Sequence, residues 1–425
     1  MKSSFKKFKL KNGANVLFAP MANTEAITTL ALLPLGSRCE KDNEAGSAHF
    51  IEHMLFKGTK KRPSNLILSQ ELDVLGADYN AFTSREYTGY YIKILKENLE
   101  NSLDILADIF FNSLFDEKEI EKEKGVILEE IKMYEDNPLL YISDLFYETF
   151  FNNHPLGRNI AGSLATVSSL NRQKLLGYKN DLYQPNNLWI VLAGAVKKSD
   201  LKLVEKYFGQ AGRGEKRKFE KFVSQSHQPQ IKVVQRQVEQ VQLALGFSSL
   251  SYLEPQQETL DLLSIILGGN MSSRLFQEVR VKRGLAYAVG CGASAFNETG
   301  VFSIGAGVDK EKLNQALEVI IEELNKIKKT GVSLKELSQA KDFLIRKSKL
   351  ALEDSMVSVS WYGDQALFLK KIETPEEKYQ KIKKVTANQV KKIAQRIFEK
   401  NSITLAMVGR TQPAESFQRI LAKLK

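Results

Sequence analysis

The sequence predicts an α+β protein of two homologous α/β-sandwich domains, each a mainly antiparallel sheet with helices packed on it. One reason is that the order of expected strands and helices repeats once along the 425 residues. Another is that each half ends with an expected strand in which an asparagine precedes the closing glycine by eight residues, at 186–194 and 401–409. A polar run rich in Lys, Gly and Gln near the midpoint is typical of a linker. We therefore expect domains at 1–210 and 231–425, joined by a linker at 211–230.

The first half begins with a hairpin signal. Two alternating segments, 5–10 and 16–20, flank Asn12-Gly13, and a buried strand is expected at 26–34. The further elements expected here are a helix around 49–56, a helix at 64–75, strands at 79–83 and 87–94, long helices to about 151, a helix at 173–182 and a strand at 188–193.

The second half repeats this order. A strand at 240–247 is the counterpart of 27–35, and a helix at 257–267 stands where the first half has its histidine-containing helix, but without histidines. The remaining expected elements are strands at 287–293 and 302–307, helices at 310–329 and 334–350, and a strand at 403–408.

Two of the four histidines lie four residues apart, in His49-Phe50-Ile51-Glu52-His53. On a helix, His49, Glu52 and His53 share one side. Two imidazoles one turn apart can both reach a Zn²⁺ ion at about 2.0–2.1 Å, and the adjacent Glu52 can take a proton from a metal-bound water. The pattern predicts a catalytic zinc helix; the alternative is a pair of hydrogen-bonded core histidines.

A third ligand is expected from the helical segment 117–136. In helical projection Glu130 falls in the middle of the apolar face, Glu123 shares that position, and Glu129 lies at the solvent edge. Carboxylates are rarely buried without a partner, so Glu130 is predicted as the third ligand. Glu123 is predicted to orient a ligating imidazole. A buried salt bridge to an arginine is the alternative for Glu123. The apolar face is formed by Val126, Ile127, Ile131, Met133 and Tyr134.

Composition excludes several classes. No apolar run approaches the roughly 18 residues of a membrane helix, so no membrane partner is expected. The N-terminal residues lack the apolar stretch of a signal peptide, and two cysteines 252 positions apart (291 − 39) form no disulfide framework, so we expect a cytoplasmic protein. The net charge of +11 comes from 61 basic residues interspersed with 50 acidic ones, without a nucleic-acid-binding motif, so no nucleic-acid partner is expected.

The His-x-x-Glu-His motif, with Glu130 lying 77 positions after His53 (130 − 53), resembles the inverzincin metallopeptidases of the pitrilysin and insulinase family. The likeness is strongest to short bacterial members related to mitochondrial processing peptidase. Further matching segments are 58–59, 76–83, 85–88, 134–138, 154–157, 273–276 and 283–287.

This resemblance implies a zinc endopeptidase with one Zn²⁺ per chain and Glu52 as the general base. It implies that unfolded peptides add as a strand beside Asn80, Ala81 and Phe82, although Asn80 and Ala81 could belong to a plain strand. It also implies that Arg280 and Tyr287 contact the substrate and stabilise the oxyanion. The alternatives for these two are a helix C-cap for Arg280 and a core position for Tyr287.

Two functional classes remain open. Besides an active endopeptidase, the chain could be a non-catalytic or hetero-oligomeric family subunit with an assembly or partner-activating role. The four residues His49, Glu52, His53 and Glu130 are all present, which favours the enzyme. Because one chain also carries the arginine and tyrosine of the second half, we expect a homodimer rather than a complex with a different subunit.

Overall fold

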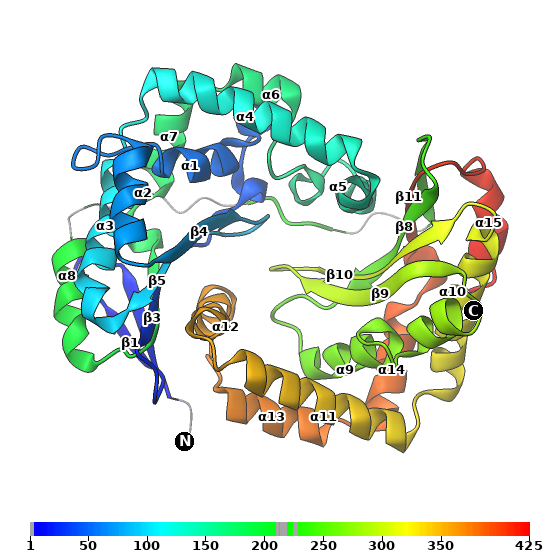
Figure 1. Cartoon of the computed structure of the whole chain (residues 1–425). Coiled ribbons are helices and arrows are strands. Elements are labelled where there is room, and N and C mark those ends of the chain that lie inside the picture. Colours follow the sequence, from blue (N-terminus) through cyan, green and yellow to red (C-terminus); the bar gives the residue numbers. More distant parts are fainter. Residues whose placement is uncertain (1–3, 210–211, 213–218, 224–227) are drawn as a thin grey trace. The chain divides into compact units, whose positions relative to one another are not determined.

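The computed structural model describes residues 4–209, 212, 219–223 and 228–425, which form two compact units (Figure 1). Unit 1 comprises Met1–Lys132, Arg158–Glu220 and Leu350–Glu376, and unit 2 comprises Met133–Gly157, Lys221–Lys349 and Glu377–Lys425. Each unit takes in one helical segment from the other half of the sequence, whereas the expected domains at 1–210 and 231–425 divide the chain into its two repeats. Much of the expected linker at 211–230 lies outside the described residues.

The described part of unit 1 contains a six-stranded sheet in the order β1-β2-β6-β3-β5-β4. Strands β2 and β6 are parallel, and all other neighbours are antiparallel, including the expected hairpin of β1 and β2. The strands are β1 (Lys6–Lys9), β2 (Asn15–Pro20), β3 (Ala26–Leu33), β4 (Asp78–Thr83), β5 (Thr88–Leu95) and β6 (Trp189–Gly194).

Both faces of this sheet are covered, because successive residues of a strand point to opposite faces. On one face, Phe18 belongs to a core that also contains Phe50 and Leu106 from the helices. On the other face, Leu17 packs in a smaller core with Tyr362 of α12. The helices of unit 1 are α1 (Ser47–Leu55), α2 (Asn65–Val74), α3 (Leu99–Asn112), most of α4 (Glu117–Asp136), α6 (Leu164–Ser169), α7 (Arg172–Leu182), α8 (Leu201–Phe208) and α12 (Ser355–Phe368).

The described part of unit 2 repeats this topology. Its sheet has the order β7-β11-β8-β10-β9, with β7 and β11 parallel and the other neighbours antiparallel. The two sheets together confirm the predicted fold class. Strand β7 begins at the end of the expected linker and was not predicted. The strands are β7 (Gln230–Val234), β8 (Gln240–Ser249), β9 (Ala286–Ala295), β10 (Gly300–Asp309) and β11 (Thr404–Val408).

The second sheet also has helices on both faces. Leu245 and Phe247 pack into a core with α9, α10 and α14, and Ala244 lies on the opposite face with Phe146 of α5. Gly246 of β8 allows this approach, because a Cβ there would lie 2.2 Å from the Phe146 ring. The helices of unit 2 are α5 (Pro138–Phe151), α9 (Gln257–Gly268), α10 (Leu313–Thr330), most of α11 (Leu334–Ala351), most of α13 (Pro375–Lys384), α14 (Ala387–Ile397) and α15 (Glu415–Leu421).

A half-buried ion pair fixes the start of α11 in unit 2. Arg274 donates to both carboxylate oxygens of Glu336, at 2.7 and 3.1 Å, and to the Gly331 carbonyl at 3.0 Å. Burial acts to raise the pKa of Glu336, but the hydrogen bonds from Arg274 and Ser333 outweigh it and lower that pKa to about 2. The carboxylate is therefore ionised over most of the pH range.

In the part of the chain that the structure describes, every helix is too short or too polar to cross a membrane.

Candidate metal centre

Helix α1 carries the histidine motif next to the edge strand β4 of the first sheet (Figure 1). One side of α1 is apolar, and Phe50, Ile51 and Met54 are fully buried in the core. His49 and His53 project from the other side, as the helical spacing requires. The amphipathic pattern of α1 thus leaves both imidazoles turned away from the core that anchors the helix.

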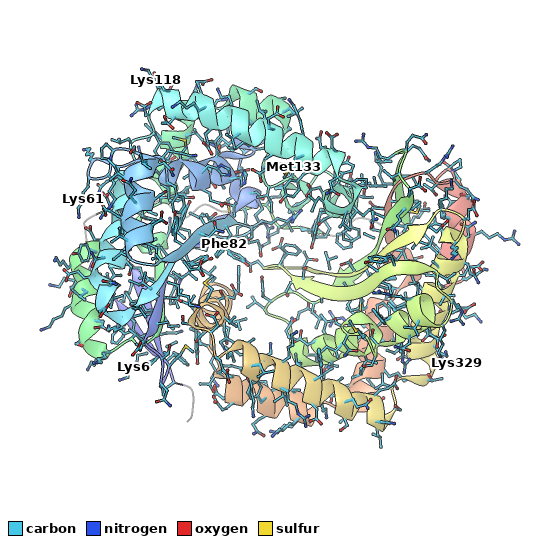
Figure 2. The ribbon with its side chains drawn as sticks, in the orientation of Figure 1. Lys6, Lys61, Phe82, Lys118, Met133 and Lys329 are labelled. Atoms are coloured by element: carbon cyan, nitrogen blue, oxygen red, sulfur yellow. The ribbon has the colours of Figure 1, made fainter. Side chains whose placement is uncertain are left out.

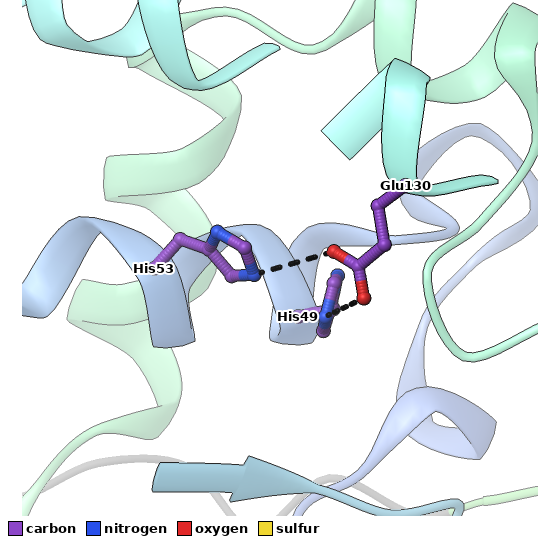
Figure 3. Close-up of side chains that lie close together, drawn as sticks. All are labelled: His49, His53 and Glu130. Carbon is purple, nitrogen blue, oxygen red and sulfur yellow. Dashed lines mark ion pairs between the residues drawn. The ribbon is translucent and has the colours of Figure 1, made fainter. Parts of the chain in front are cut away.

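The structure brings His49, His53 and Glu130 together (Figure 3). His49 Nε2 lies 3.9 Å from Glu130 Oε1, and His53 Nε2 lies 3.7 Å from Glu130 Oε2. One donor atom from each of the three residues lies within 4.8 Å of the others, and all three side chains are half-buried. Glu130 comes from α4, so the cluster joins two helices distant in sequence.

This donor set fits a zinc ion. A tetrahedral ion bound at about 2.0–2.1 Å separates its ligand atoms by roughly 3.4 Å, close to the two observed nitrogen–oxygen distances. Two imidazoles and one carboxylate are the kind of three-ligand set that catalytic zinc sites use. Two Nε2 atoms facing one carboxylate, all half-buried, are arranged as such a site needs.

His53 is oriented by Glu123, as predicted. Its Nδ1 donates to Glu123 Oε1 at 2.8 Å, which leaves Nε2 as the site-facing nitrogen. The other oxygen of Glu123 pairs with Lys57 Nζ at 2.6 Å. Burial acts to raise the pKa of Glu123, but hydrogen bonds from His53 and Lys57 outweigh it and hold that pKa below its ordinary value. The structure thus combines the two possibilities left open for Glu123, with a lysine where an arginine was considered.

His49 has a different environment. Burial, with a smaller contribution from His53, lowers the pKa of His49 to about 4. The imidazole is therefore neutral near pH 7, the form that binds a metal. Its Nδ1 is buried and has no hydrogen-bond partner among the residues that the structure describes.

Glu52 lies beside the cluster and is held in place by the end of β4. Thr83 Oγ1 donates to Glu52 Oε2 at 2.6 Å. Burial raises the pKa of Glu52, and the neighbouring negative charge of Glu130 acts in the same direction. A raised pKa makes the carboxylate a stronger base, which suits a group that accepts a proton in catalysis.

The order of exposure along α4, whose two ends carry Lys118 and Met133 in Figure 2, follows the helical projection for its glutamates. The side chain of Glu129 is 74% exposed, that of Glu130 29% and that of Glu123 6%. The expectation that Glu130 lies in the middle of the apolar face is wrong. Val126 and Met133, which lie on one side of it in projection, are more than half exposed. The buried face runs through Ile120, Glu123, Ile127 and Ile131, and Glu130 lies at its margin.

Asn80, Ala81 and Phe82 lie on β4, and Figure 2 labels Phe82. The only neighbour of β4 in the described sheet is β5. The other edge of β4 is therefore the position where a further strand can pair. Asn80 Oδ1 accepts a hydrogen bond from the Ala81 N–H at 2.8 Å. A peptide that used this N–H would have to displace the asparagine side chain.

Arg280 and Tyr287 lie together in unit 2. Arg280 is in a π-helical turn at Phe276–Val281, and its guanidinium carbon lies 5.3 Å from the centre of the Tyr287 ring on β9. Tyr287 is 73% exposed, so the alternative of a core position is wrong. π-Helical turns are frequent at functional sites.

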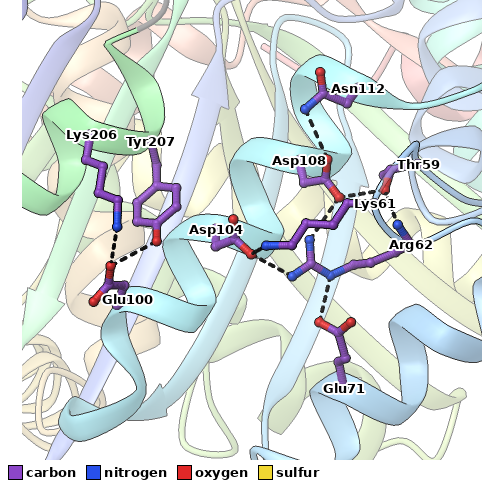
Figure 4. A network of polar contacts seen from close by, with 10 residues as sticks. All are labelled: Thr59, Lys61, Arg62, Glu71, Glu100, Asp104, Asp108, Asn112, Lys206 and Tyr207. Carbon is purple, nitrogen blue, oxygen red and sulfur yellow. Dashed lines mark hydrogen bonds and ion pairs between the residues drawn. The ribbon is translucent and has the colours of Figure 1, made fainter.

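A polar network fastens the segment after α1 to α3 (Figure 4). The buried Arg62 donates to Asp108 at 2.8 Å, to Asp104 at 2.7 Å and to Glu71 at 2.7 Å. Thr59 also donates to Asp108, at 2.5 Å. The network joins the chain that leaves the histidine helix, which carries Lys57, to α3.

Two residues of the site were not predicted in their roles. Lys57 acts on a glutamate 66 positions away (123 − 57), and Thr83 contacts a carboxylate 31 positions away. Neither contact follows from periodicity, because both depend on how α4 and β4 pack against α1.

The fold and the cluster define a two-unit α+β protein with a candidate His₂Glu metallopeptidase centre. Residues 19–164 match the family model for insulinase (peptidase family M16), and residues 169–344 match the model for the peptidase M16 inactive domain. The chain is 36% identical to the uncharacterized zinc protease YmxG of Bacillus subtilis over 405 residues, covering 95% of this chain and 98% of that one. It is 37% identical to an uncharacterized zinc protease of Rickettsia bellii over 417 residues, with 96% and 98% covered. The chain therefore belongs to the insulinase family of peptidases, which confirms the predicted resemblance.

Solved structures show the same fold. A protease from Helicobacter pylori superposes with a TM-score of 0.89 at 24% identity, covering 97% of this chain and all of that one. A peptidase M16 inactive domain from Pseudomonas fluorescens superposes with a TM-score of 0.88 at 20% identity, with the same coverage.

Proposed function

We propose that the protein is a zinc-dependent endopeptidase that hydrolyses peptide bonds in unfolded peptides. The observation that carries this proposal is the cluster of His49, His53 and Glu130 with Glu52 beside it. These three ligands would hold one Zn²⁺ per chain. The ion, when bound, supplies a water acidified toward neutrality and a positive charge that polarises the scissile carbonyl.

The other steps belong to the side chains of this protein. Glu52 accepts a proton from the attacking water, and Thr83 keeps the carboxylate oriented for this transfer. Glu52 then delivers the proton to the leaving amine as the C–N bond breaks. Arg280 and Tyr287 are proposed to stabilise the negative charge on the carbonyl oxygen.

The edge of β4 supports the preference for unfolded substrates. A peptide that pairs with Asn80, Ala81 and Phe82 must be extended, because strand addition uses its main-chain groups. Peptides already folded into helices or sheets have those groups engaged. We propose that the working assembly is a homodimer, in which the partner's second half completes each site.

The second functional candidate is a non-catalytic subunit, favoured by the match of residues 169–344 to an inactive-domain model. That match begins after Glu130, however, and all three metal-ligand candidates lie in the segment matched by the insulinase model. The experiment that separates the candidates is cleavage of an unstructured peptide library by the zinc-loaded protein, read by mass spectrometry. We expect cleavage by wild type and none by Glu52→Gln, with folded proteins left intact; an inert wild type would favour the non-catalytic subunit.

A further inference from the structure

Glu40 caps the helix that carries the histidines. Its Oε2 accepts the Gly46 N–H at 2.9 Å, and its Oε1 accepts the Ala48 N–H at 2.7 Å. Gly46 is the N-cap residue of α1 and has no side chain to satisfy these first N–H groups. A carboxylate at a helix N-terminus also interacts favourably with the helix dipole. Glu40, only 4% exposed, therefore replaces the missing cap from outside the helix.

The chain around this cap has little room to move. Arg158 donates to the Glu40 carbonyl oxygen at 2.9 Å and also pairs with Asp42. Gly46 has a φ of 94°, and a Cβ there would lie 2.6 Å from the carbonyl oxygen of Ala161. The start of α1 is thus held against the segment that follows Arg158.

The two histidines are held in different ways. His53 is fixed through its side chain, because Glu123 accepts its Nδ1 proton. His49 Nδ1 has no such partner among the described residues, although it is buried. His49 is the third residue of α1, and the first turn of an uncapped helix frays. The direction of the His49 ring therefore depends on the main chain of the turn that Glu40 caps.

We propose that Glu40 is a positioning residue that acts through His49, fixing the first turn of α1 so that Nε2 faces Glu130. This inference rests on the proposed function, since it assigns Glu40 a part in building the zinc site. In the part of the chain that the structure describes, the hydrogen-bond partners of the Glu40 carboxylate are main-chain N–H groups at the start of the helix and not the metal ligands.

The test is a double-mutant cycle on zinc affinity, measured by competition with a chromophoric chelator. Glu40→Gln keeps the volume but turns an NH₂ group toward a main-chain N–H. Burial raises the pKa of Glu40 to about 8, so the titrations are run near pH 8.5, where the carboxylate predominates. We expect a loss of roughly tenfold in affinity in the wild-type background, the scale of changes to groups that orient ligands.

Repeating the Glu40→Gln substitution in His49→Ala and in His53→Ala proteins shows whether its effect on zinc affinity acts through His49. Glu40→Gln should cost the same roughly tenfold in His53→Ala, but nothing further in His49→Ala, where the ligand it positions is gone. Equal losses in both backgrounds would overturn the proposal, because they would mean a general loosening of α1. No loss in the wild-type background would also overturn it.

Two further variants separate positioning from stability. Asn171→Ala removes the cap of α7, where Asn171 Oδ1 accepts the Lys174 N–H at 3.0 Å, and should lower the melting temperature while leaving zinc affinity unchanged. Glu40→Asp keeps the charge and should lose less affinity than Glu40→Gln; if the glutamine variant does not fold, the cycle is run with aspartate and judged by the same outcomes. If the wild-type protein binds no zinc, the proposed function itself is refuted. If the wild type binds zinc and Glu40→Gln binds it with equal affinity, only the role of Glu40 is refuted.

Discussion

Replacing Glu123 by glutamine tests how His53 is held. The carboxylate accepts from His53 Nδ1 at 2.8 Å and from Lys57 Nζ at 2.6 Å, with its side chain 6% exposed. An amide has one oxygen for these two donors, so its NH₂ group must face either the imidazole N–H or the ammonium group. One of the two contacts becomes a donor–donor clash.

The expected loss follows from this geometry. Groups that orient a metal-bound histidine change metal affinity by about 10- to 100-fold, or roughly 1.4–2.7 kcal/mol. We expect Glu123→Gln to weaken zinc binding within this range, and Glu130→Gln to lose most of it, because a ligand is removed. The matched control is Glu129→Gln, since that side chain is 74% exposed and pairs with Lys132 at the surface.

The assay is zinc competition with a chelator, paired with peptide cleavage by the reconstituted protein. Glu129→Gln should stay within a few-fold of wild type in both. Equal losses at positions 129 and 123 would refute the assigned orientation of α4. Full affinity in Glu123→Gln would refute the role of the His53–Glu123 contact.

Three further outcomes are expected. Arg62→Met should lower the free energy of unfolding by about 3–5 kcal/mol in denaturant titrations, because the buried Asp108 carboxylate keeps its hydrogen bonds from Thr59 and Asn112 but loses its positively charged partner. The exposed Lys61→Met should cost about 0–1 kcal/mol, and similar values for the two variants would contradict the network. The pKa of Glu336 lies at about 2, below its ordinary 4.5, so its contribution to the free energy of unfolding is complete above about pH 4.5 and is lost as the pH falls through 2. Glu336→Gln should therefore have a lower melting temperature at neutral pH, and its melting temperature should fall less steeply than that of wild type as the pH is lowered. An equally steep fall in both proteins would contradict this. In the proposed homodimer, inactive Glu52→Gln and Arg280→Ala proteins should regain roughly a quarter of wild-type activity after subunit exchange; no recovery despite verified exchange would place each site within one chain.

Much of the candidate site could be predicted from the helical periodicity of the sequence. The four-residue spacing of His49 and His53 and the seven-residue spacing of Glu123 and Glu130 each place two side chains on one side of a helix, and the structure keeps both relations. The prediction failed where exposure depended on what lies opposite the helix. Val126 is apolar and was assigned to the buried face, yet it is 52% exposed, because the core lies against the neighbouring side of α4.

Contacts between distant segments could not be predicted from the sequence either, because they too depend on which elements pack against each other. Helix α12, from the second half, covers one face of the first sheet, and α5, from the first half, covers one face of the second. Strand β7 was missed because it is short and begins where a polar run ends. Lys57 and Glu40 have no repeating pattern, since each is defined by a partner that only the folded chain brings near.

The central claim is tested most directly by metal content. Purified wild-type protein should contain one zinc per chain, lose peptide cleavage when a chelator removes the metal, and recover it with one equivalent of zinc. The double variant His49→Ala/His53→Ala should contain no bound zinc, while Glu52→Gln should keep one per chain and cleave nothing. Full zinc in the double histidine variant, or undiminished cleavage by the metal-free wild type, would contradict the account.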